Sequence, residues 1–296
     1  MKNKIKFFLT GSSGFIGKNL LELLSDKFEF VAPGHKELDL SNTQAVADFL
    51  QSQNFDLVIH AANFGGNRAQ TALPGVLEAN KQMFLNLVKN SEKFGRMIFL
   101  GSGAEYGKQQ PIVNVKELDF GKVKPEDEYG KAKYFASEYI ATHPNIVNLR
   151  CFGVFGKYED YTTRFISNAI CRALFDLPII LKRNVKFDYI YVNDLAKIIE
   201  YFILHEPKEK FYNIGSGRST DLLGLAEIVK TATGGEAEIK VLNPGLNNEY
   251  TGDNSLLRGE LPDFKFTPFN VAIGEMVEWY KANMNLIDKD KLNFDA

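Results

Sequence analysis

The sequence predicts an α/β fold built on a doubly wound parallel sheet, with a smaller and discontinuous C-terminal lobe. Through the first half, short apolar segments typical of buried strands alternate with segments in which apolar residues recur every three or four positions. That alternation is typical of a parallel sheet covered by helices on both faces. A glycine-rich turn also joins the first predicted strand directly to the first predicted helix, as in open sheets of this class.

The strands and helices of this sheet can be assigned in order along the chain. Five apolar segments are predicted as strands: Ile5–Leu9, Phe28–Ala32, Asp56–His60, Met97–Gly101 and Ile146–Arg150. Helical periodicity marks the segments between them: Lys18–Leu24, Ser41–Gln51, Gly75–Phe94 and Tyr129–Thr142. Ser41 to Gln44 is interpreted as a capping box that opens the second helix.

The composition of the sequence changes after Lys157, where Pro, Gly and Asn become more frequent and the predicted helices and strands become shorter. The segment Phe211–Gly215 still has the composition of a buried strand that could rejoin the main sheet. We therefore predict a first domain of residues 1–156 with about 190–216. A smaller lobe is predicted for residues about 157–189 with 217–296.

Composition excludes several classes of protein. The 296 residues hold 35 Lys and Arg against 37 Asp and Glu, so no excess of basic charge is available for nucleic acid or an anionic membrane surface. No segment reaches the ~18 apolar residues of a membrane span, and the N-terminus does not resemble a signal peptide. The only two cysteines, Cys151 and Cys171, are expected to be buried free thiols without a metal. A cytoplasmic protein is expected.

The segment Thr10–Gly17 predicts a dinucleotide site, because it lies between an apolar strand and a helical pattern. In such a loop Gly11 makes the tight turn, Gly14 lets backbone N–H groups approach a diphosphate, and Gly17 lets the helix pack on the strand. The anion would lie at the positive end of the helix. An ordinary surface loop is the alternative. The predicted cofactor-binding residues here are Gly11, Ser13, Gly14, Phe15, Ile16 and Gly17.

A second group of residues predicts proton chemistry. Tyr129 and Lys133 are four apart in a helical pattern, which places them on one face. A nearby ammonium favours the phenolate and would lower the pKa of the tyrosine, so that it can exchange a proton near neutral pH. An ordinary surface pair is the alternative. Ser102 ends a predicted strand, at the sheet edge where open α/β sheets bind ligands. We therefore predict Tyr129, Lys133 and Ser102 as catalytic residues.

These motifs occur in an order that resembles a known family almost end to end. They are Thr10–Gly17, His60-Ala61-Ala62, Ser102 with Tyr106, Tyr129 with Lys133, Arg150–Gly156 and Tyr189–Asp194. The chain is similar to the extended branch of the short-chain dehydrogenase/reductase superfamily, which contains nucleotide-sugar epimerases, dehydratases and ketoreductases. The resemblance implies a Rossmann sheet, an NAD(P) cofactor and a nucleotide-diphosphate sugar as substrate.

The resemblance also implies residue roles. Tyr129 would be the proton donor or acceptor, Lys133 would bind the nicotinamide ribose and tune Tyr129, and Ser102 would hydrogen-bond the reacting sugar oxygen. Further residues fall where this family lines the cofactor: Ala61, Ala62, Asn80 and Phe152. No metal is implied.

Departures from the family pattern narrow the reaction. Dehydratases carry an Asp-Glu pair directly after the Ser or Thr, where this chain has Gly103 and Ala104. GDP-fucose synthases carry a Cys at the position of Ala104, which argues against epimerisation through enolisation here. Gly153 replaces an Asn common in epimerases. These departures favour a simple reduction.

The turn after the second strand bears on the choice of cofactor. It reads Ala32-Pro33-Gly34-His35-Lys36, without the Asp that NAD-holding epimerases use for the adenosine ribose. His35 and Lys36 suit a 2′-phosphate, so NADP(H) is favoured. Asp39 and Leu40 resemble the Asp-Leu that contacts adenine in this family. Asp39 as a ribose ligand, which would mean NAD(H), is the alternative.

Substrate recognition is expected beside the active site and in the second lobe. Asn63 to Arg68, with a glycine pair, is interpreted as a loop near the substrate. Arginines could clamp a diphosphate, although a solvated surface arginine is the alternative for each. The predicted substrate residues are Asn63, Arg68, Gly103, Arg164, Arg183 and Arg258. Phe187 stands where the family usually has an Arg.

The leading hypothesis is an NADPH-dependent reductase of a 4-keto, nucleotide-linked deoxysugar in a pathway to surface polysaccharide. The alternatives are an NAD-dependent nucleotide-sugar 4-epimerase and a catalytically silent NAD(P)-sensing protein. The resemblance also implies a homodimer, in which Val76–Phe94 and Tyr129–Thr142 pair with their copies in a four-helix bundle. An apolar stripe could form that interface: Met83, Phe84, Leu87, Phe135 and Ile140. That all of these face the sheet is the alternative.

Overall fold

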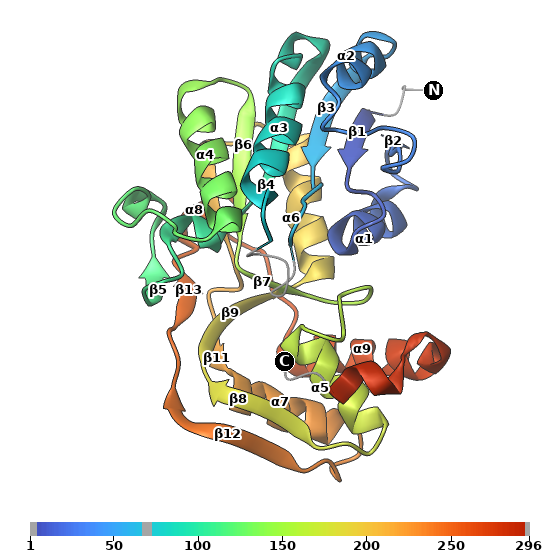
Figure 1. The fold of residues 1–296 in the computed structure, drawn as a ribbon, viewed down its shortest axis with the longest axis vertical. Helices are drawn as coiled ribbons and strands as arrows, with labels where there is room; N and C mark the ends of the chain where they lie inside the picture. The colour runs from blue at the N-terminus through green and yellow to red at the C-terminus, as the bar shows by residue number, and fades with distance from the viewer. Residues whose placement is uncertain (1–4, 67–72, 294–296) are drawn as a thin grey trace.

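The main body of the protein is a six-stranded, all-parallel sheet with helices on both faces (Figure 1). The computed structural model describes residues 5–66 and 73–293. In sheet order the strands are β10 (Phe211–Ile214), β6 (Ile146–Cys151), β4 (Phe94–Ser102), β3 (Phe55–His60), β1 (Lys6–Thr10) and β2 (Glu29–Val31). The predicted doubly wound Rossmann sheet is confirmed. The chain order reverses between β1 and β3, where such sheets bind ligands at the carboxyl ends of their strands.

Strand alternation divides the apolar residues of the sheet between its two faces. Phe7 and Leu9 pack on one side with α1 (Phe15–Leu24) and α6 (Val192–Leu204). Phe8 points to the opposite side of the sheet, where it packs with three further helices. These are α2 (Thr43–Gln51), α3 (Val76–Val88) and α4 (Glu128–Thr142). Both faces of the sheet are therefore buried, as expected for a parallel sheet.

Several predicted boundaries were wrong, and side chains explain two of them. The helix predicted to reach Phe94 ends at Val88, because the Asn90 amide donates to the carbonyl of Asn86 at 2.8 Å and a 3₁₀ turn, η1 (Ser91–Lys93), follows. The cap of α2 is Asn42, whose side chain accepts from Ala45 N at 3.0 Å, so the capping box was placed one residue early. In addition, β2 is shorter than predicted and β4 longer.

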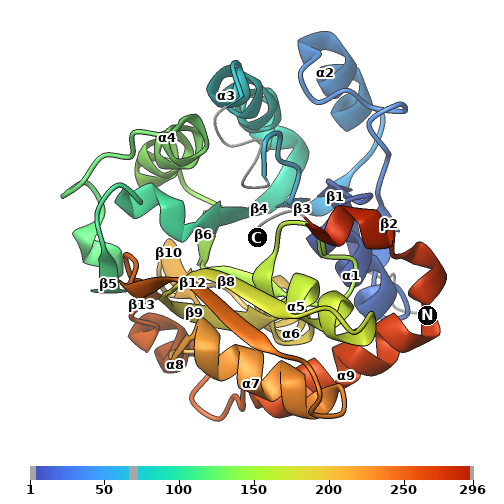
Figure 2. The ribbon, with the colours of Figure 1, turned by 60° about the horizontal axis from the view of Figure 1, so that its bottom comes forward.

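The second lobe contains two small sheets and its own core (Figure 2). One sheet has the order β11 (Ser219–Asp221), β9 (Lys186–Tyr191), β13 (Tyr250–Gly252) and β5 (Ile112–Val115), and β7 (Gly153–Phe155) also pairs with β9. The other joins β8 (Ile179–Asn184) to β12 (Ile239–Leu246). Its helices are α5 (Phe165–Leu174), α7 (Leu222–Ala232) and α9 (Phe269–Ala282), whereas α8 (Ser255–Glu260) packs beside β10 of the main sheet, with Leu257 in the main core. The remaining 3₁₀ turns are η2 (Gly103–Tyr106), η3 (Glu117–Asp119), η4 (Met284–Leu286) and η5 (Lys289–Asn293).

The two lobes exchange strands. β10 comes from the second half of the chain and completes the main sheet beside β6. β5 comes from the first half and pairs with β13 in the second lobe. The division into domains stays a prediction. Within the described ranges, no helix combines the length and apolar character needed to cross a membrane.

The apolar stripe expected at a dimer interface lies mostly in the core. Phe84, Leu87 and Ile140 are at most 1 % exposed and pack between the sheet and helices α3 and α4. Met83 and Phe135 are only partly buried, and the Lys81 ammonium lies 4.9 Å from the centre of the Phe135 ring. Three of the five residues therefore face the sheet, as in the alternative interpretation. The four-helix-bundle dimer stays a prediction.

Candidate active site

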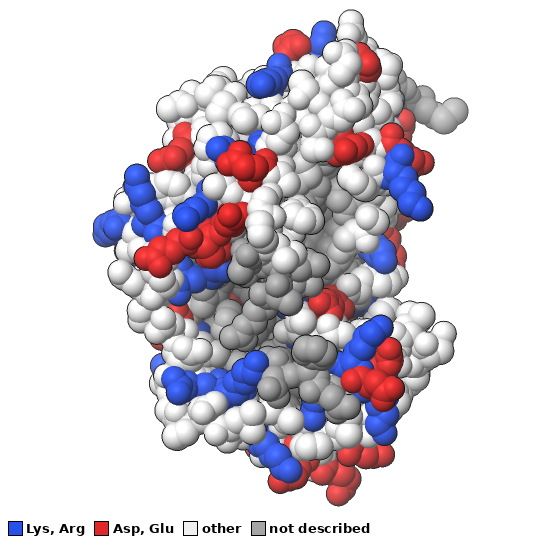
Figure 3. Space-filling model, viewed as in Figure 1, with Lys and Arg blue, Asp and Glu red and all other residues white. Residues whose placement is uncertain are grey.

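A cavity of about 1190 Å³ opens at the carboxyl ends of β1, β3 and β4 and extends to the second lobe. Its main-sheet side is lined by Gly11–Gly17 and by Ser102, Tyr129 and Lys133. The other side is lined by residues of the second lobe, among them Arg164, Lys182, Arg183 and Tyr250. On the face shown in Figure 3, acidic and basic side chains are interspersed. Because the two signs of charge are mixed on this face, the charged side chains that can act on a bound ligand are those that line the cavity.

The glycine loop is built for close backbone contact. Gly11 has a φ of +72°, and a Cβ atom there would lie 2.6 Å from the backbone nitrogen of Ala62. A Cβ atom on Gly17 would lie 2.2 Å from the carbonyl oxygen of Gly11. The N-cap of α1 is Gly14, which offers no side-chain hydrogen bond to the first N–H groups of the helix. Those N–H groups can bind an anion, so the loop fits the diphosphate of a dinucleotide.

The turn after β2 forms one end of the cavity. His35 is exposed and lines the cavity, together with Asp39 and Leu40, whereas Lys36 is exposed and does not line it. The Asp39 carboxylate accepts from the hydroxyl and the N–H of Ser41 at 2.7 and 2.9 Å, which lowers its pKa. Ser12 donates to the carbonyl of Ala32 at 3.0 Å and ties the glycine loop to this turn.

The structure brings the three predicted catalytic side chains together. Tyr129 lies in the first turn of α4, which is capped by the Asp127 side chain accepting from Gly130 N at 2.9 Å. The Tyr129 hydroxyl is close enough to that of Ser102, at the end of β4, for the two to interact, and both residues line the cavity. The Lys133 ammonium donates to the carbonyl of Leu100 at 2.8 Å and lies 5.8 Å from the centre of the Tyr129 ring. Their catalytic roles stay predictions.

The expected lowering of the Tyr129 pKa was wrong for the protein alone. Burial raises the pKa of Tyr129, and the interaction with Ser102 and the charge of Arg164 only partly oppose this. Burial also lowers the pKa of Lys133 to about 8, and its ammonium is bound to the Leu100 carbonyl. The phenol is therefore protonated at neutral pH. A protonated phenol suits a proton donor.

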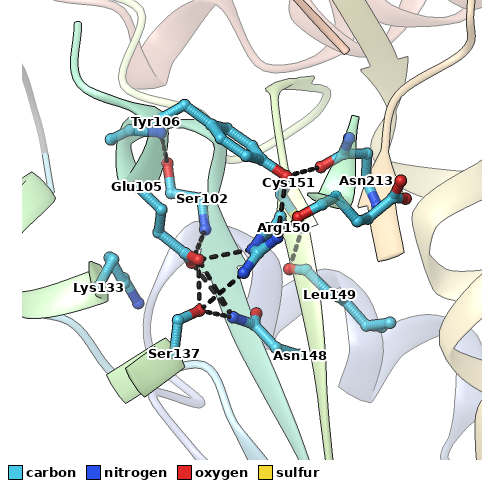
Figure 4. A network of polar contacts seen from close by, with 12 residues as sticks. Ser102, Glu105, Tyr106, Lys133, Ser137, Asn148, Leu149, Arg150, Cys151 and Asn213 are labelled. Carbon is cyan, nitrogen blue, oxygen red and sulfur yellow. Dashed lines mark hydrogen bonds and ion pairs between the residues drawn. The ribbon is translucent and has the colours of Figure 1, made fainter. Parts of the chain in front are cut away.

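A fully buried ion pair that the sequence analysis missed supports Ser102 (Figure 4). The Glu105 carboxylate accepts from the Ser102 N–H at 3.0 Å, from Arg150 Nε at 2.7 Å and from the Ser137 hydroxyl at 2.5 Å. Ser102 in turn accepts from Ala104 N at 3.1 Å, so η2 is held from both ends. Glu105 therefore fixes the backbone at Ser102.

The remaining N–H groups of Arg150, the partner of Glu105, also form hydrogen bonds within this network (Figure 4). Arg150 donates to the Tyr106 hydroxyl at 2.9 Å, and Tyr106 donates to Asn213 on β10 at 2.7 Å. Its charge also lies 4.7 and 4.5 Å from the centres of the Phe120 and Phe211 rings. A charged residue inside a strand as apolar as β6 requires a buried partner, and this was the signal available in the sequence.

Three of the predicted substrate residues line the cavity. Arg164 donates to the carbonyl of Gly66 at 2.8 Å, and its charge acts on Tyr129. Arg183 lines the cavity from β8, and Asn63 lines it from the segment after β3. Arg68 lies outside the described residues.

Other predicted residues do not line this cavity. The Arg258 guanidinium donates to the carbonyl of Phe264 at 3.0 Å and covers the Phe266 ring. Because it does not line the cavity, Arg258 is not among the residues that we propose to bind the substrate. The Asn80 amide binds the backbone of Phe64 instead, which makes it a support for the segment after β3. Gly103 is buried behind the cavity wall.

Several cavity residues were not predicted. Tyr250 and Tyr189 line the cavity from the second lobe, and Phe187 lies between them, with its ring centre 5.3 Å from each. Glu159 also lines the cavity, and burial raises the pKa of its carboxyl group to about 7. Cys151 is a buried free thiol, as expected. Among residues 5–66 and 73–293, no cluster of His, Cys, Asp and Glu could hold a metal ion.

Comparisons with known proteins agree with this arrangement. The model of the NAD dependent epimerase/dehydratase family matches residues 7–215, a range that includes the glycine loop, Ser102, Tyr129 and Lys133. GDP-L-colitose synthase of Yersinia pseudotuberculosis is 25 % identical over 254 residues, which cover 78 % of this chain and 82 % of that protein.

Solved structures show the same fold. A GDP-mannoheptose C4 reductase from Campylobacter jejuni with NADP bound has a TM-score of 0.82 at 20 % identity, covering 95 % of this chain and 99 % of that one. The UDP-glucose 4-epimerase of Thermus thermophilus in complex with NAD has a TM-score of 0.77 at 22 % identity, covering 94 % and 99 %. Both a reductase and an epimerase thus share this architecture.

Proposed function

The chain belongs to the NAD-dependent epimerase/dehydratase family, and from this premise we propose that it is an NADPH-dependent reductase of a 4-keto, nucleotide-linked deoxysugar. One observation carries the choice of reduction. A protonated Tyr129 lies beside Ser102 at the cavity wall, while the two positions after Ser102 hold Gly103 and Ala104 and offer no acid or base. The carboxylate of Glu105 is fully buried and bound to Arg150, so it does not reach a substrate.

The residues of the site would work as follows. A reduced dinucleotide, with its diphosphate held by the glycine loop, would supply the hydride for the ketone carbon. Tyr129 gives its phenolic proton to the carbonyl oxygen as that oxygen gains negative charge, and Ser102 donates a hydrogen bond to the same oxygen. The charge of Lys133 then stabilises the phenolate that remains. Arg164, Lys182 and Arg183 would hold the diphosphate of the sugar nucleotide.

A 4-epimerase is the second candidate, because the same three side chains can remove and return a proton. Asp39 favours it, since this carboxylate lines the cavity near the turn after β2 and could bind a ribose hydroxyl of NAD. The two functions differ in what happens to the cofactor. A reductase consumes one NADPH per product, whereas an epimerase regenerates its NAD in every cycle.

This difference provides the test. The purified protein is analysed for retained cofactor and then offered 4-keto-6-deoxyhexoses linked to GDP, dTDP or UDP, with NADPH or NADH. We expect loss of NADPH absorbance and one new hydroxyl group in the product for at least one of these sugars. A tightly held NAD, with interconversion of 4-epimers and no net change in cofactor, would instead establish the epimerase.

The proposal that NADPH is the cofactor leads to a prediction about the turn after β2. His35 lines the cavity and Lys36 does not, so His35→Ala should remove a contact to the 2′-phosphate. We expect the affinity ratio of NADPH to NADH to fall about fivefold, the worth of one ordinary hydrogen bond. Binding is measured by the fluorescence of the reduced cofactor.

Lys36→Ala is the matched control for this prediction, since it removes a neighbouring exposed side chain that does not line the cavity. It should leave the ratio within about twofold of the parent, as expected for a surface substitution. Equal loss of affinity for both cofactors in His35→Ala would mean that the residue only supports the turn.

A further inference from the structure

Tyr250 brings a second phenol to the catalytic serine. It lies on β13 of the second lobe, beyond the residues matched by the family model. Its ring packs between Phe152 and Phe187, with centres 5.1 and 5.3 Å away. Its hydroxyl lies against Gly103, the residue after Ser102, and interacts with the Ser102 hydroxyl, as the Tyr129 hydroxyl also does. Three hydroxyl groups from β4, α4 and β13 therefore meet at one wall of the cavity.

The backbone beside Ser102 is shaped to admit this hydroxyl. A Cβ atom on Gly103 would lie 2.7 Å from the Tyr250 hydroxyl oxygen and 2.8 Å from the Phe152 ring. Any larger residue at position 103 would push Tyr250 away from Ser102. The glycine that removes an acidic group from this position thus also makes the space in which the second phenol sits.

The register of the second-lobe sheet fixes the position of Tyr250. β13 is paired on both sides, with Tyr250 opposite Ile112 of β5 and opposite Phe187 of β9. The backbone of Tyr250 is therefore held by two neighbouring strands, and its ring is held by the contacts with Phe152 and Phe187. The Tyr250 hydroxyl is thus held beside Ser102, whose oxygen takes part in the proposed reaction. We therefore regard Tyr250 as a positioning residue.

The hydrogen bonds of Ser102 can be counted. A serine hydroxyl has one proton to donate and two lone pairs that accept. Ala104 N–H occupies one lone pair at 3.1 Å. If Tyr250 donates to the second, the single proton of Ser102 is left to point into the cavity, toward either the reacting oxygen or Tyr129. Burial raises the pKa of Tyr250, so its proton is present at neutral pH.

We propose that Tyr250 donates a hydrogen bond to Ser102 and thereby directs the single Ser102 proton into the cavity, first toward the reacting oxygen and, after the proton transfer, toward the Tyr129 phenolate. When Tyr129 gives up its proton, the phenolate needs a donor, and a chain from Tyr250 through Ser102 to Tyr129 has the polarity that supplies one. Hydrogen bonds in such a chain strengthen one another. This inference rests on the proposed function, because it assigns Tyr250 a part in the same proton transfer.

The test compares Tyr250→Phe with the parent. The variant keeps the ring between Phe152 and Phe187 and removes only the hydroxyl group. With NADPH and whichever nucleotide-linked 4-keto-6-deoxyhexose the parent reduces, we expect kcat to fall about tenfold, on the order of one lost hydrogen bond, with KM nearly unchanged. Tyr139→Phe is the matched control, because Tyr139 lies on α4 outside the cavity and stacks on His143.

A second readout needs no substrate. The ionisation of Tyr129 is followed by ultraviolet difference titration, with Tyr129→Phe to identify its contribution. Loss of the Tyr250 hydroxyl should raise the pKa of Tyr129, since the phenolate loses a donor that is oriented toward it. In a Ser102→Ala background, Tyr250→Phe should have no further effect on kcat. Additive losses would show that Tyr250 does not act through Ser102.

Gly103→Ala provides an independent route if Tyr250→Phe folds poorly, since it displaces the same hydroxyl from Ser102. It should lower kcat and raise the pKa of Tyr129 in the same direction. An unchanged kcat and an unchanged Tyr129 titration in Tyr250→Phe would overturn the proposal, and so would a rise in KM alone. Full activity in Tyr129→Phe would instead overturn the proposed function itself, so the two failures can be told apart.

Discussion

Replacement of Tyr129 by phenylalanine is expected to lower turnover by about a hundredfold or more while leaving the affinity for NADPH close to that of the parent. The variant loses only the transferable proton, and general acid catalysis by one side chain contributes at least on the order of a hundredfold. Ring packing in the first turn of α4 is preserved. Turnover and cofactor binding are measured on the same preparation.

Two comparisons sharpen this prediction. Tyr134→Phe makes the same chemical change on the same helix, at a side chain that stacks on Phe120 and does not line the cavity, so it should retain turnover. Lys133→Met should lower both turnover and cofactor affinity, because the ammonium is expected to serve the ribose as well as Tyr129. Turnover of Tyr129→Phe within about threefold of the parent would contradict its assignment as the proton donor.

The second large effect concerns stability. Arg150→Met should lower the free energy of unfolding by about 3–5 kcal/mol, because it leaves the Glu105 carboxylate buried without its charged partner. Urea unfolding at neutral pH measures this loss. Turnover should fall even in the folded fraction, since Glu105 would no longer hold the Ser102 backbone firmly.

The double variant Arg150→Met with Glu105→Gln is the control for this interpretation. It removes both charges and should recover part of the lost stability, because a neutral buried pair avoids the cost of the unpaired charge. Lys27→Met breaks an exposed pair with Glu200 and should change stability by less than about 1 kcal/mol. A loss in Arg150→Met no larger than that of Lys27→Met would mean that the buried pair does little to hold η2.

The main sheet was predictable because its signals are local. Apolar strands, helical periodicity and the Thr10–Gly17 loop each lie within a short stretch of sequence. The spacing of Tyr129 and Lys133 likewise placed them on one face of α4. Boundaries were less predictable, since single polar side chains set them, as Asn42 and Asn90 show.

The residues that were missed depend on contacts between distant segments. Arg150 meets Glu105 only because β6 lies beside β4, with Gly101 opposite Arg150. Tyr250 reaches Ser102 only through the pairing of β13 with β5 and β9. The Tyr129 pKa was wrongly expected to fall because spacing reveals a neighbouring ammonium but not the depth of burial. Arg258 resembled other arginines in sequence, yet α8 directs it to Phe264 and Phe266.

The exchange of strands between the lobes has a consequence for synthesis on the ribosome. Asn213 accepts from Tyr106 and donates to the carbonyls of Val115 and Asp253, so the polar network behind Ser102 closes only after residue 253 has been made. Before residue 214 has been made, Arg150 and Glu105 also lie beside an incomplete sheet that lacks β10. A nascent chain that has just completed β6 therefore cannot yet hold a native catalytic centre. Folding of this centre therefore requires both β10 and the segment around Asp253 to have been synthesised.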